Sequence, residues 1–255
     1  MRIKNFGAIA IKSFALLAVL VVVFGMPHQA TAQDAPTPYP NMAPIDQYLM
    51  PDQAAEIALA RSGAPESISR EAKVQVLRRH GFETAVPGKN GFVCIVGRGW
   101  TSAPDSDFWN PKVRVPMCVN APAARTYLLR VTKITNLALA GHTLAQVNEA
   151  IAAAIAKKEL PAMEPGAMCY MMGKQGYGGD SIPHWPSHLM FFYSQFDAAS
   201  WGANLPGSPV IAVEDPLEQM TSFVIPAQHW SDGSEVLPAI AVPAGGAAPP
   251  PHHRS

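Results

Sequence analysis

Apolar and polar residues follow a helical period in the first well-patterned segment, residues 51–61. Pro51 opens this segment, Asp52 and Glu56 lie near its start, and Gly63 comes shortly after it. Proline and acidic side chains suit the first turn of a helix, and glycine suits the position after the last turn. The pattern therefore predicts a helix that packs against the rest of the fold through one face.

After this helix the period of the pattern falls to two, as in strands. Three short runs of this kind, at residues 73–78, 82–86 and 91–97, are separated by His80 and Gly81 and by a Pro-Gly-Lys-Asn sequence. Glycine, proline and asparagine at such separations favour tight turns. We therefore expect a three-stranded meander in which each strand pairs with the next.

A helical hairpin is predicted farther along the chain. Residues 122–140 place apolar side chains three or four positions apart, and Gly141 ends the pattern. Thr143 and Gln146 have the spacing of a capping box, in which each side chain bonds the backbone N–H of the other. A second helix with its own apolar stripe begins there. Two such helices are suited to cover a sheet.

Shorter apolar runs complete the predicted sheet. Residues 113–119 predict an edge strand, because Pro116 lacks the N–H that a central strand uses. No later connection is long and periodic enough for a crossover helix, so neighbouring strands should be antiparallel. The chain thus predicts an α+β fold, a mainly antiparallel sheet covered on one face by two or three helices, in a single domain at residues 46–235. The later strand candidates are residues 167–172, 188–193, 209–213 and 221–225.

The two ends of the chain lie outside this pattern. Basic residues, an apolar run at residues 14–24 and an A-T-A sequence that ends at residue 32 predict a signal peptide at residues 1–32. The apolar run is shorter than the roughly 18 residues that span a bilayer. We expect cleavage, a secreted or periplasmic protein, and no membrane contact afterwards. Residues 33–45 predict an extended lead-in, and residues 236–255, rich in Ala, Pro and Gly, predict a disordered tail.

Composition narrows the range of partners. The chain has 19 Lys and Arg against 19 Asp and Glu, only 15% of its residues are charged, and no block of one sign occurs. Nucleic acid and anionic membranes are bound through concentrated basic surfaces. We therefore expect no nucleic-acid partner. A small molecule or glycan remains a candidate ligand, and the oligomeric state is left open.

Three cysteines, Cys94, Cys118 and Cys169, follow the predicted signal peptide. Disulfides persist in an oxidising compartment, and an odd number leaves at least one thiol free or paired between chains. A Cys94–Cys118 bridge is favoured, because both residues lie in segments that predict strands. Pairings through Cys169 stay open as alternatives.

The most unusual chemistry lies in residues 163–193, which contain a thiol, five methionines and two histidines. His184 and His188, with Asp180, Cys169 or His229 nearby in space, would supply the ligand types of a metal site. Prolines beside both histidines rule out a regular helix through them, and the H-E-x-x-H pattern is absent. The alternative is that the methionines and Cys169 are core residues of strands. The cofactor, if any, stays unknown.

The same stretch supplies the residue types of a nucleophilic enzyme. Ser181 or Cys169 is the candidate nucleophile, His184 or His188 the candidate base, and Asp180 or Asp197 the group that would orient the base. The G-x-S-x-G sequence of many hydrolases is absent. Whether the chain is an enzyme therefore stays open.

Aromatic and amide side chains predict a different kind of site. Tyr177, Trp185, Trp201 and Asn204 lie near predicted strand ends, where aromatic faces and an amide would suit a small ligand or a glycan. The alternative is that these side chains pack the core and anchor loops.

Several phrases of the sequence resemble a family of exported bacterial proteins of unknown function. These phrases are GFETAVPGKNGFVC, FWNPK, LPAMEPGAMCYMMGKQGYGGDS, HWPSHLMFF and WGANLPGSP. The resemblance implies export and implies no activity. Our leading hypothesis is a non-enzymatic small-ligand-binding protein with its site in residues 173–188 and 201–204. The alternatives are a hydrolase or metal-dependent enzyme that uses His184, His188 and Asp180, and an interaction protein of the cell envelope.

Overall fold

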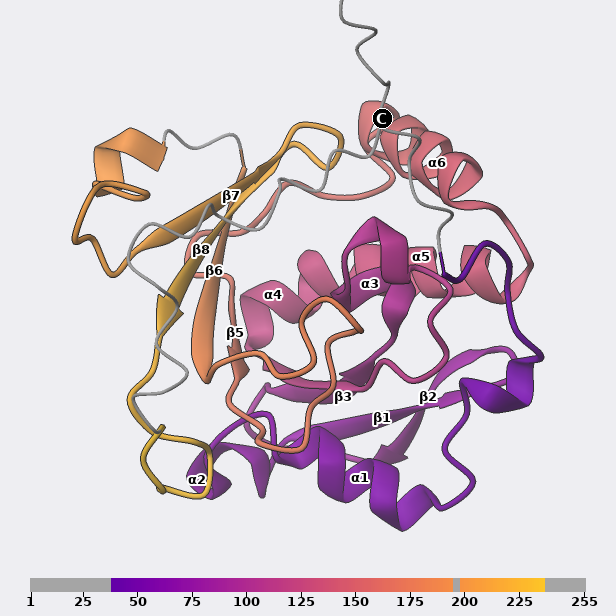
Figure 1. The fold of residues 1–255 in the computed structure, drawn as a ribbon, viewed down its shortest axis with the longest axis horizontal. Helices are drawn as coiled ribbons and strands as arrows, with labels where there is room; N and C mark the ends of the chain where they lie inside the picture. Colours follow the sequence, from indigo (N-terminus) through magenta and orange to yellow (C-terminus); the bar gives the residue numbers. More distant parts are fainter. Residues whose placement is uncertain (1–37, 195–197, 237–255) are drawn as a thin grey trace, which may run out of the picture. The chain divides into compact units, whose positions relative to one another are not determined.

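The computed structural model of the chain (Figure 1) describes residues 38–194 and 198–236. The predicted signal peptide at residues 1–32, the first residues of the predicted lead-in and nearly all of the predicted tail lie outside these ranges. The described residues form an α+β domain with one mixed, mostly antiparallel sheet, which confirms the predicted fold class.

The sheet has eight strands among the described residues, in the order β2-β1-β3-β4-β5-β6-β8-β7. Strands β1 and β3 are parallel, and the other neighbouring pairs are antiparallel. The strands are β1 (Lys73–Arg78), β2 (Gly81–Val86), β3 (Val93–Gly97), β4 (Val115–Val119), β5 (Met168–Met171), β6 (His188–Ser194), β7 (Ile211–Asp215) and β8 (Met220–Pro226).

Helices α1, α5 and α6 are where the sequence pattern places them. Thr143 and Gln146 form the predicted capping box at the start of α6, whereas the helix expected over residues 122–140 is interrupted at Thr126. Within the described chain, no helix is long and apolar enough to cross a membrane. The helices are α1 (Gln53–Arg61), α2 (Glu66–Ser69), α3 (Gly99–Ser102), α4 (Ala121–Arg125), α5 (Tyr127–Leu139) and α6 (Leu144–Ala156), with 3-10 turns η1 (Ile45–Gln47), η2 (Asp105–Asp107) and η3 (Ala198–Trp201).

The central strands are covered by helices on both faces, not on the one face that we expected. Every residue of β3 and β4 is buried. In β3, Cys94 packs in a cluster with Ala60 of α1, whereas its neighbour Ile95 packs in a cluster with Leu128 and Val131 of α5. Side chains that are adjacent along a strand point to opposite faces. Helix α1 therefore covers one face, and α4 and α5 cover the other.

The predicted meander is wrong in its third strand. Strands β1 and β2 form the expected hairpin, but β3 pairs with β1 in parallel instead of with β2. The connection passes close to the start of β1, since Lys89 N–H donates to Glu71 O at 2.8 Å and Lys73 N–H donates to Phe92 O at 2.9 Å. A Cβ atom at Gly88 would lie 2.1 Å from Lys73 N. A close crossing that only glycine permits therefore carries the chain to the other side of β1.

The strand that contains Pro116 was predicted to lie at an edge of the sheet. In the structure this strand, β4, is central and lies between β3 and β5. Pro116 lies opposite Val96, two positions from the Cys94–Cys118 pair, whose Cα atoms are only 4.0 Å apart. Such close pairs exchange no backbone hydrogen bonds, so the missing N–H of Pro116 faces β5. Pairing between β4 and β5 reaches only Cys118 and Val119. Proline is tolerated there because no ladder bond is lost.

The predicted disulfide between Cys94 and Cys118 is present. Cys169 is buried as a free thiol, and its strand partner in β4 is Val119 instead of Cys118. Since Val119 and Cys118 point to opposite faces of the sheet, Cys169 lies on the face away from the disulfide. The pairings through Cys169 are therefore excluded in the folded sheet.

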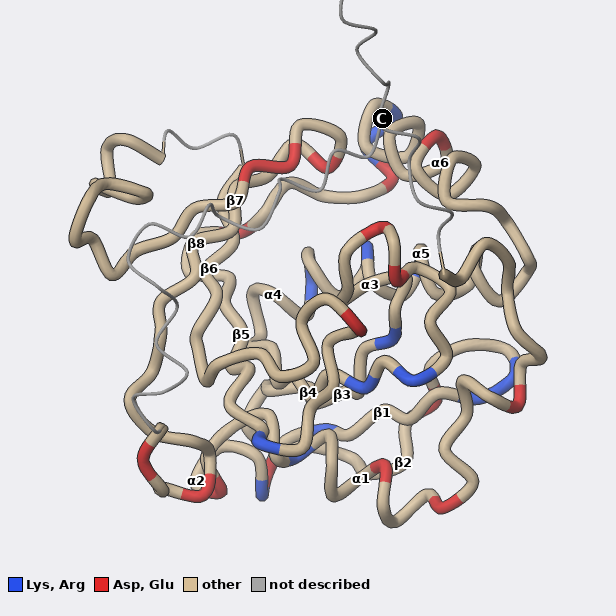
Figure 2. Tube along the Cα trace, in the orientation of Figure 1, with Lys and Arg blue, Asp and Glu red and all other residues tan. Residues whose placement is uncertain are grey.

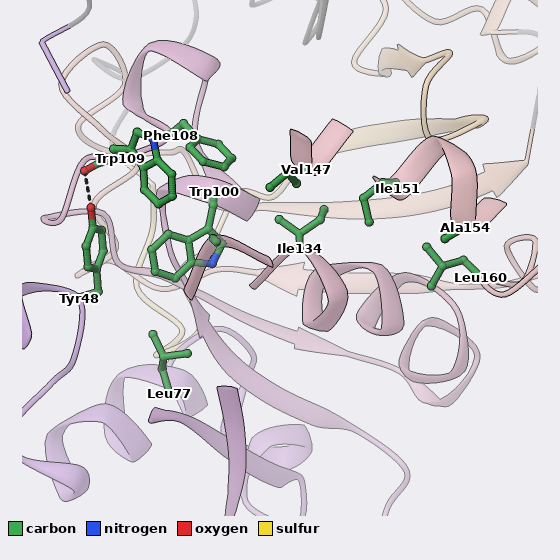
Figure 3. Packing of buried hydrophobic residues seen from close by; sticks show 11 residues of the cluster. Tyr48, Leu77, Trp100, Phe108, Trp109, Ile134, Val147, Ile151, Ala154 and Leu160 are labelled. Carbon is green, nitrogen blue, oxygen red and sulfur yellow. Dashed lines mark hydrogen bonds between the residues drawn. The ribbon is translucent and has the colours of Figure 1, made fainter. Parts of the chain in front are cut away.

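The long aromatic loop after β3 packs onto the core, as Figure 3 shows. Tyr48 and Trp100 have ring centroids 4.9 Å apart, and Tyr48 Oη donates to Trp109 O at 2.8 Å. Trp100 Nε1 donates to Thr135 Oγ1 at 3.1 Å and so joins the loop to α5. These buried contacts hold the loop in place. Another part of the same loop contacts the candidate site described below.

A buried ion pair joins α1 to the sheet. The Glu56 and Arg98 side chains are fully buried, with 2.8 Å between Glu56 Oε1 and Arg98 Nη2. Arg98 Nε also donates to Tyr48 O at 2.8 Å, and Leu77 N–H donates to Glu56 Oε1 at 3.2 Å. The remaining Lys, Arg, Asp and Glu positions are intermixed along the described chain, as Figure 2 shows.

Candidate functional site

Residues 173–187 connect β5 to β6 and lie against the loop that precedes β4. Arg114 and Tyr177 exchange two backbone hydrogen bonds, of 2.9 Å and 2.8 Å, as an isolated antiparallel bridge. The segment that holds most of the predicted site residues is thereby attached to the packed aromatic loop. It is held at a defined place without being part of a long strand.

The Asp107 side chain holds the next part of the 173–187 connection through hydrogen bonds. Its buried carboxylate accepts hydrogen bonds from Asn110 Nδ2 at 2.7 Å, from Ser181 Oγ at 3.2 Å and from Asp180 N–H at 3.3 Å. Gly179 has a φ of +131°, and a Cβ atom there would lie 2.6 Å from Asp107 Oδ2. The glycine thus lets the loop approach the carboxylate closely.

Asp180 is the exposed centre of the candidate site. Its carboxylate accepts a hydrogen bond from Tyr39 Oη at 2.6 Å and another from Tyr177 Oη. These two phenols, Tyr177 first, lower the pKa of Asp180. The hydrogen bond to Asp180 in turn raises the pKa of Tyr39 to about 12 and raises that of Tyr177. At neutral pH the site therefore presents an ionised carboxylate between two protonated phenols.

The two histidines of the predicted site have different environments. His188 is buried at the start of β6, and its Nδ1 lies 2.6 Å from Pro186 O, so Nδ1 carries the proton that it donates. Burial lowers the pKa of His188, which is therefore neutral at physiological pH. His184 is exposed. Among the described residues, neither histidine forms a hydrogen bond with a serine or cysteine.

The predicted nucleophiles and metal ligands are likewise not assembled with the histidines. Ser181 donates to Asp107, and Cys169 packs in the core cluster with Phe192. Burial raises the pKa of the Cys169 thiol to about 12, so the thiolate is not formed at neutral pH. Within the part of the chain that the structure describes, no three His, Cys, Asp or Glu side chains are grouped to hold a metal ion.

Trp185 lies beside His188, with ring centroids 5.8 Å apart, and lines a small cavity. The cavity volume is about 10 Å³, room for about one water molecule. Trp185 Nε1 is buried and has no hydrogen-bond partner among the described residues. The other lining residues are Val115, Pro116, Met171, Gly173 and Gly176.

Trp201 lies near the opposite end of β6 from Trp185. Its ring stacks on Phe223 with centroids 4.3 Å apart and lies 5.2 Å from the ring of Tyr193. Tyr193 is five positions along β6 from His188, which corresponds to roughly 17 Å. The structure therefore does not bring Trp201 together with Trp185 and Tyr177.

Asn204 uses its side-chain amide to bind the backbone of β7. Asn204 Nδ2 donates to Ala212 O at 3.0 Å, and Ala212 N–H donates to Asn204 Oδ1 at 3.0 Å. The backbone φ of Asn204 is +60°, a conformation that asparagine tolerates better than most residues. Its amide is thus engaged within the fold.

Two substitutions of Asn204 should separate the contribution of its amide hydrogen bonds from the effect of its positive φ. Asn204→Gly keeps a residue that adopts positive φ but loses both amide bonds, and we expect unfolding to become easier by about 1 kcal/mol. Asn204→Ala also places a Cβ at positive φ, so we expect a loss of about 2 kcal/mol. Urea denaturation measures both. Equal stability of the alanine variant and the wild type would contradict the structural role of the amide.

Sequence patterns did not identify the two residues that complete the site, Asp107 and Tyr39. Asp107 lies in a loop without regular period, and Tyr39 lies in the proline-rich lead-in, 141 positions from its partner Asp180. The one available signal was the aromatic loop itself, because a long aromatic loop in a compact domain is commonly packed or functional.

Comparisons of the chain with protein-family models, with curated proteins and with solved structures found no match.

Proposed function

We propose that this chain is an exported, non-enzymatic binding protein whose ligand site is the Asp180 carboxylate with its flanking phenols, Tyr39 and Tyr177. The ligand class that fits best is a small molecule rich in hydrogen-bond donors, such as a glycan. The observation that carries the proposal is an exposed, ionised carboxylate that accepts hydrogen bonds from two tyrosines. The backbone N–H of the same residue donates to a buried aspartate.

The chemistry of the carboxylate supports a donor-bearing ligand. An ionised carboxylate offers about four acceptor positions, and the two phenols occupy two of them. The remaining positions on an exposed group are available to ligand hydroxyl or amine groups. The tyrosine rings beside them supply the aromatic surface that sugar rings and small ligands commonly contact.

The support beneath Asp180 favours binding because the site is already ordered. Asp107 fixes the backbone N–H of Asp180 and the hydroxyl of Ser181, and the Arg114–Tyr177 bridge fixes the other side of the loop. A site held in its binding geometry loses less conformational entropy when a ligand arrives. Trp185 lies farther along the same loop as a further aromatic side chain.

Export is part of the proposal. The predicted signal peptide at residues 1–32 and the resemblance to exported bacterial proteins both favour it, and the Cys94–Cys118 disulfide suits a periplasmic or extracellular location. The histidines are not used in this proposal, since His188 is buried and neutral and His184 has no part in the Asp180 hydrogen bonds.

Substituting Asp180→Asn tests the site directly. The probes are a panel of neutral oligosaccharides and, separately, a panel of alkylamines and polyamines, with binding followed by chemical-shift changes of the 173–188 backbone amides. We expect an oligosaccharide to shift these amides in the wild type. Because asparagine replaces an anionic acceptor by a neutral one, we expect about a tenfold loss of affinity, since hydrogen bonds to charged groups are stronger than those to neutral groups.

The matched control is Glu83→Gln, which removes an exposed carboxylate on β2. Its affinity should equal that of the wild type. Binding of amines alone would replace the glycan assignment by a cationic ligand. If no probe shifts the 173–188 amides, or if Asp180→Asn binds as well as the wild type, the proposed site is wrong.

A further inference from the structure

The outer half of the sheet carries an apolar patch on the face away from α4 and α5. Register places its residues side by side, since Met168 of β5 lies opposite Phe191 of β6, and Leu189 of β6 lies opposite both Tyr170 of β5 and Ile225 of β8. All five side chains are partly exposed, and none is charged. We call these five residues the apolar patch.

The borders of the patch are closed by packed aromatic side chains. On the β4 side, the ring of Tyr170 lies 6.1 Å from that of Phe92, next to the core that α1 covers. On the β7 side, Trp201 stacks on Phe223, the partner of Phe191. Between these borders the patch is a strip of sheet face that crosses β5, β6 and β8. Contiguous apolar surface on one face of a sheet is typical of places where another segment or protein packs.

The last described residue, Val236, is attached to the chain just after the end of β8. Val236 N–H donates to Gln228 O at 2.8 Å, and Gln228 follows the last residue of β8 by two positions. Ile225, at one end of the patch, is three positions from Gln228, roughly 10 Å along an extended chain. The next residues of the sequence therefore start within reach of the patch.

Those next residues begin with a short apolar run. Residues 237–243 read LPAIAVP, with no charged or polar side chain, whereas residues 244–255 read AGGAAPPPHHRS. Seven extended residues span roughly 23 Å, more than the two inter-strand spacings of about 4.8 Å that separate β5 from β8. The apolar part of the tail is therefore long enough to cross the strip.

We propose that the apolar patch is the docking surface for residues 237–243 of the same chain, in place of the disorder that composition alone predicts for this part of the tail. Leu237, Ile240 and Val242 supply the side chains that cover the patch, and the attachment at Val236 gives the segment a high effective concentration there. Docking across a sheet face uses side-chain contacts instead of ladder hydrogen bonds, so Pro238 and Pro243 are compatible with it. This inference is independent of the ligand site at Asp180.

Two truncations test the docking. One chain ends at Val236 and lacks the whole tail, and the matched control ends at Pro243 and keeps the apolar segment. With methyl-labelled protein, the Leu189 and Ile225 methyl signals should shift in the chain that ends at Val236 and stay unchanged in the control. Emission of the dye ANS, which binds exposed apolar surface, should rise about threefold in the shorter chain only.

A point variant and an added peptide complete the test. In the full chain, Ile240→Asp should reproduce the methyl shifts of the shorter chain, and a synthetic LPAIAVP peptide added to the shorter chain should reverse them. Unchanged Leu189 and Ile225 signals after removal of residues 237–255 would overturn the proposal. A full chain that is dimeric by light scattering, with methyl signals that change on dilution, would also overturn it by assigning the patch to a second copy.

Discussion

Replacing Arg98 by methionine is expected to lower the free energy of unfolding by about 3–5 kcal/mol, because a buried charge would lose its partner. Arg98 is fully buried, pairs with Glu56 at 2.8 Å and donates to Tyr48 O at 2.8 Å. Burial lowers the pKa of Arg98, whereas the charge of Glu56 raises it. Without Arg98, the Glu56 carboxylate of α1 would remain in the core, and among the described residues its one other ionic partner is Arg78, at 3.6 Å. Urea denaturation at neutral pH measures the loss.

Two control variants test whether the stability loss in Arg98→Met arises from the buried ion pair. Arg70→Met removes an exposed ion pair with Glu66 and should leave the free energy of unfolding nearly unchanged, because exposed ion pairs are screened by solvent. The double variant Glu56→Gln with Arg98→Met should recover part of the stability lost in Arg98→Met, because glutamine is uncharged and still accepts from Leu77 N–H. A double variant as unstable as the sum of the two single variants would argue against coupling between the two charges.

Reduction of the Cys94–Cys118 disulfide is expected to have an effect of similar size. The bridge joins residues 24 positions apart, and closing a loop of that length stabilises the folded state by about 3 kcal/mol in the chain-entropy model. Thermal denaturation with and without dithiothreitol should show this difference. The double variant Cys94→Ala with Cys118→Ala should be as unstable as the reduced protein and insensitive to the reductant.

Cys169→Ala is the matched control for the disulfide. It removes the buried thiol and should leave the dithiothreitol-dependent difference unchanged. Alkylation should modify one thiol per chain, and only after denaturation, since Cys169 is buried. Rapid alkylation of Cys169 in the native protein would contradict its placement in the core.

Local patterns in the sequence predicted those parts of the fold that local physics determines. The capping box at Thr143, the glycine after α5 and the hairpin of β1 and β2 depend on residues close in sequence, and the structure has all three. The neighbours of β3 and the central position of β4 depend on how distant strands meet. Gly88 and Pro116 each have a local meaning, a turn and an edge, that tertiary packing overrides.

The same distinction applies to Glu56. Near the start of a helix, a glutamate suits the positive end of the helix dipole, which is how the sequence pattern accounts for it. In the structure Asp52 caps α1, and Glu56 instead reaches a buried arginine 42 positions away. A charged residue gives no sign in the sequence that its partner lies across the core.

The candidate site was only partly predictable for a related reason. Asp180 and Tyr177 stood out because they lie in one glycine-rich stretch, but Tyr39 and Asp107 reach them from distant parts of the chain. Trp201 and Asn204 have residue types that suit ligand binding, and both instead make contacts within the fold. Residue type alone does not tell a ligand contact from an internal one.

The placement of Asn204 also affects whether another copy of the chain can pair with the edge of the sheet. Strand β7 is the last strand of the sheet, and unpaired backbone groups on such a strand invite another chain to add to it. The Asn204 amide occupies both groups of Ala212, and Asn204 N–H and Ser208 Oγ contact Val210. Farther along β7, the side chain of Glu214 is exposed and charged, and charged side chains on an edge strand disfavour pairing with another chain. These features disfavour the addition of another chain along this edge of the sheet.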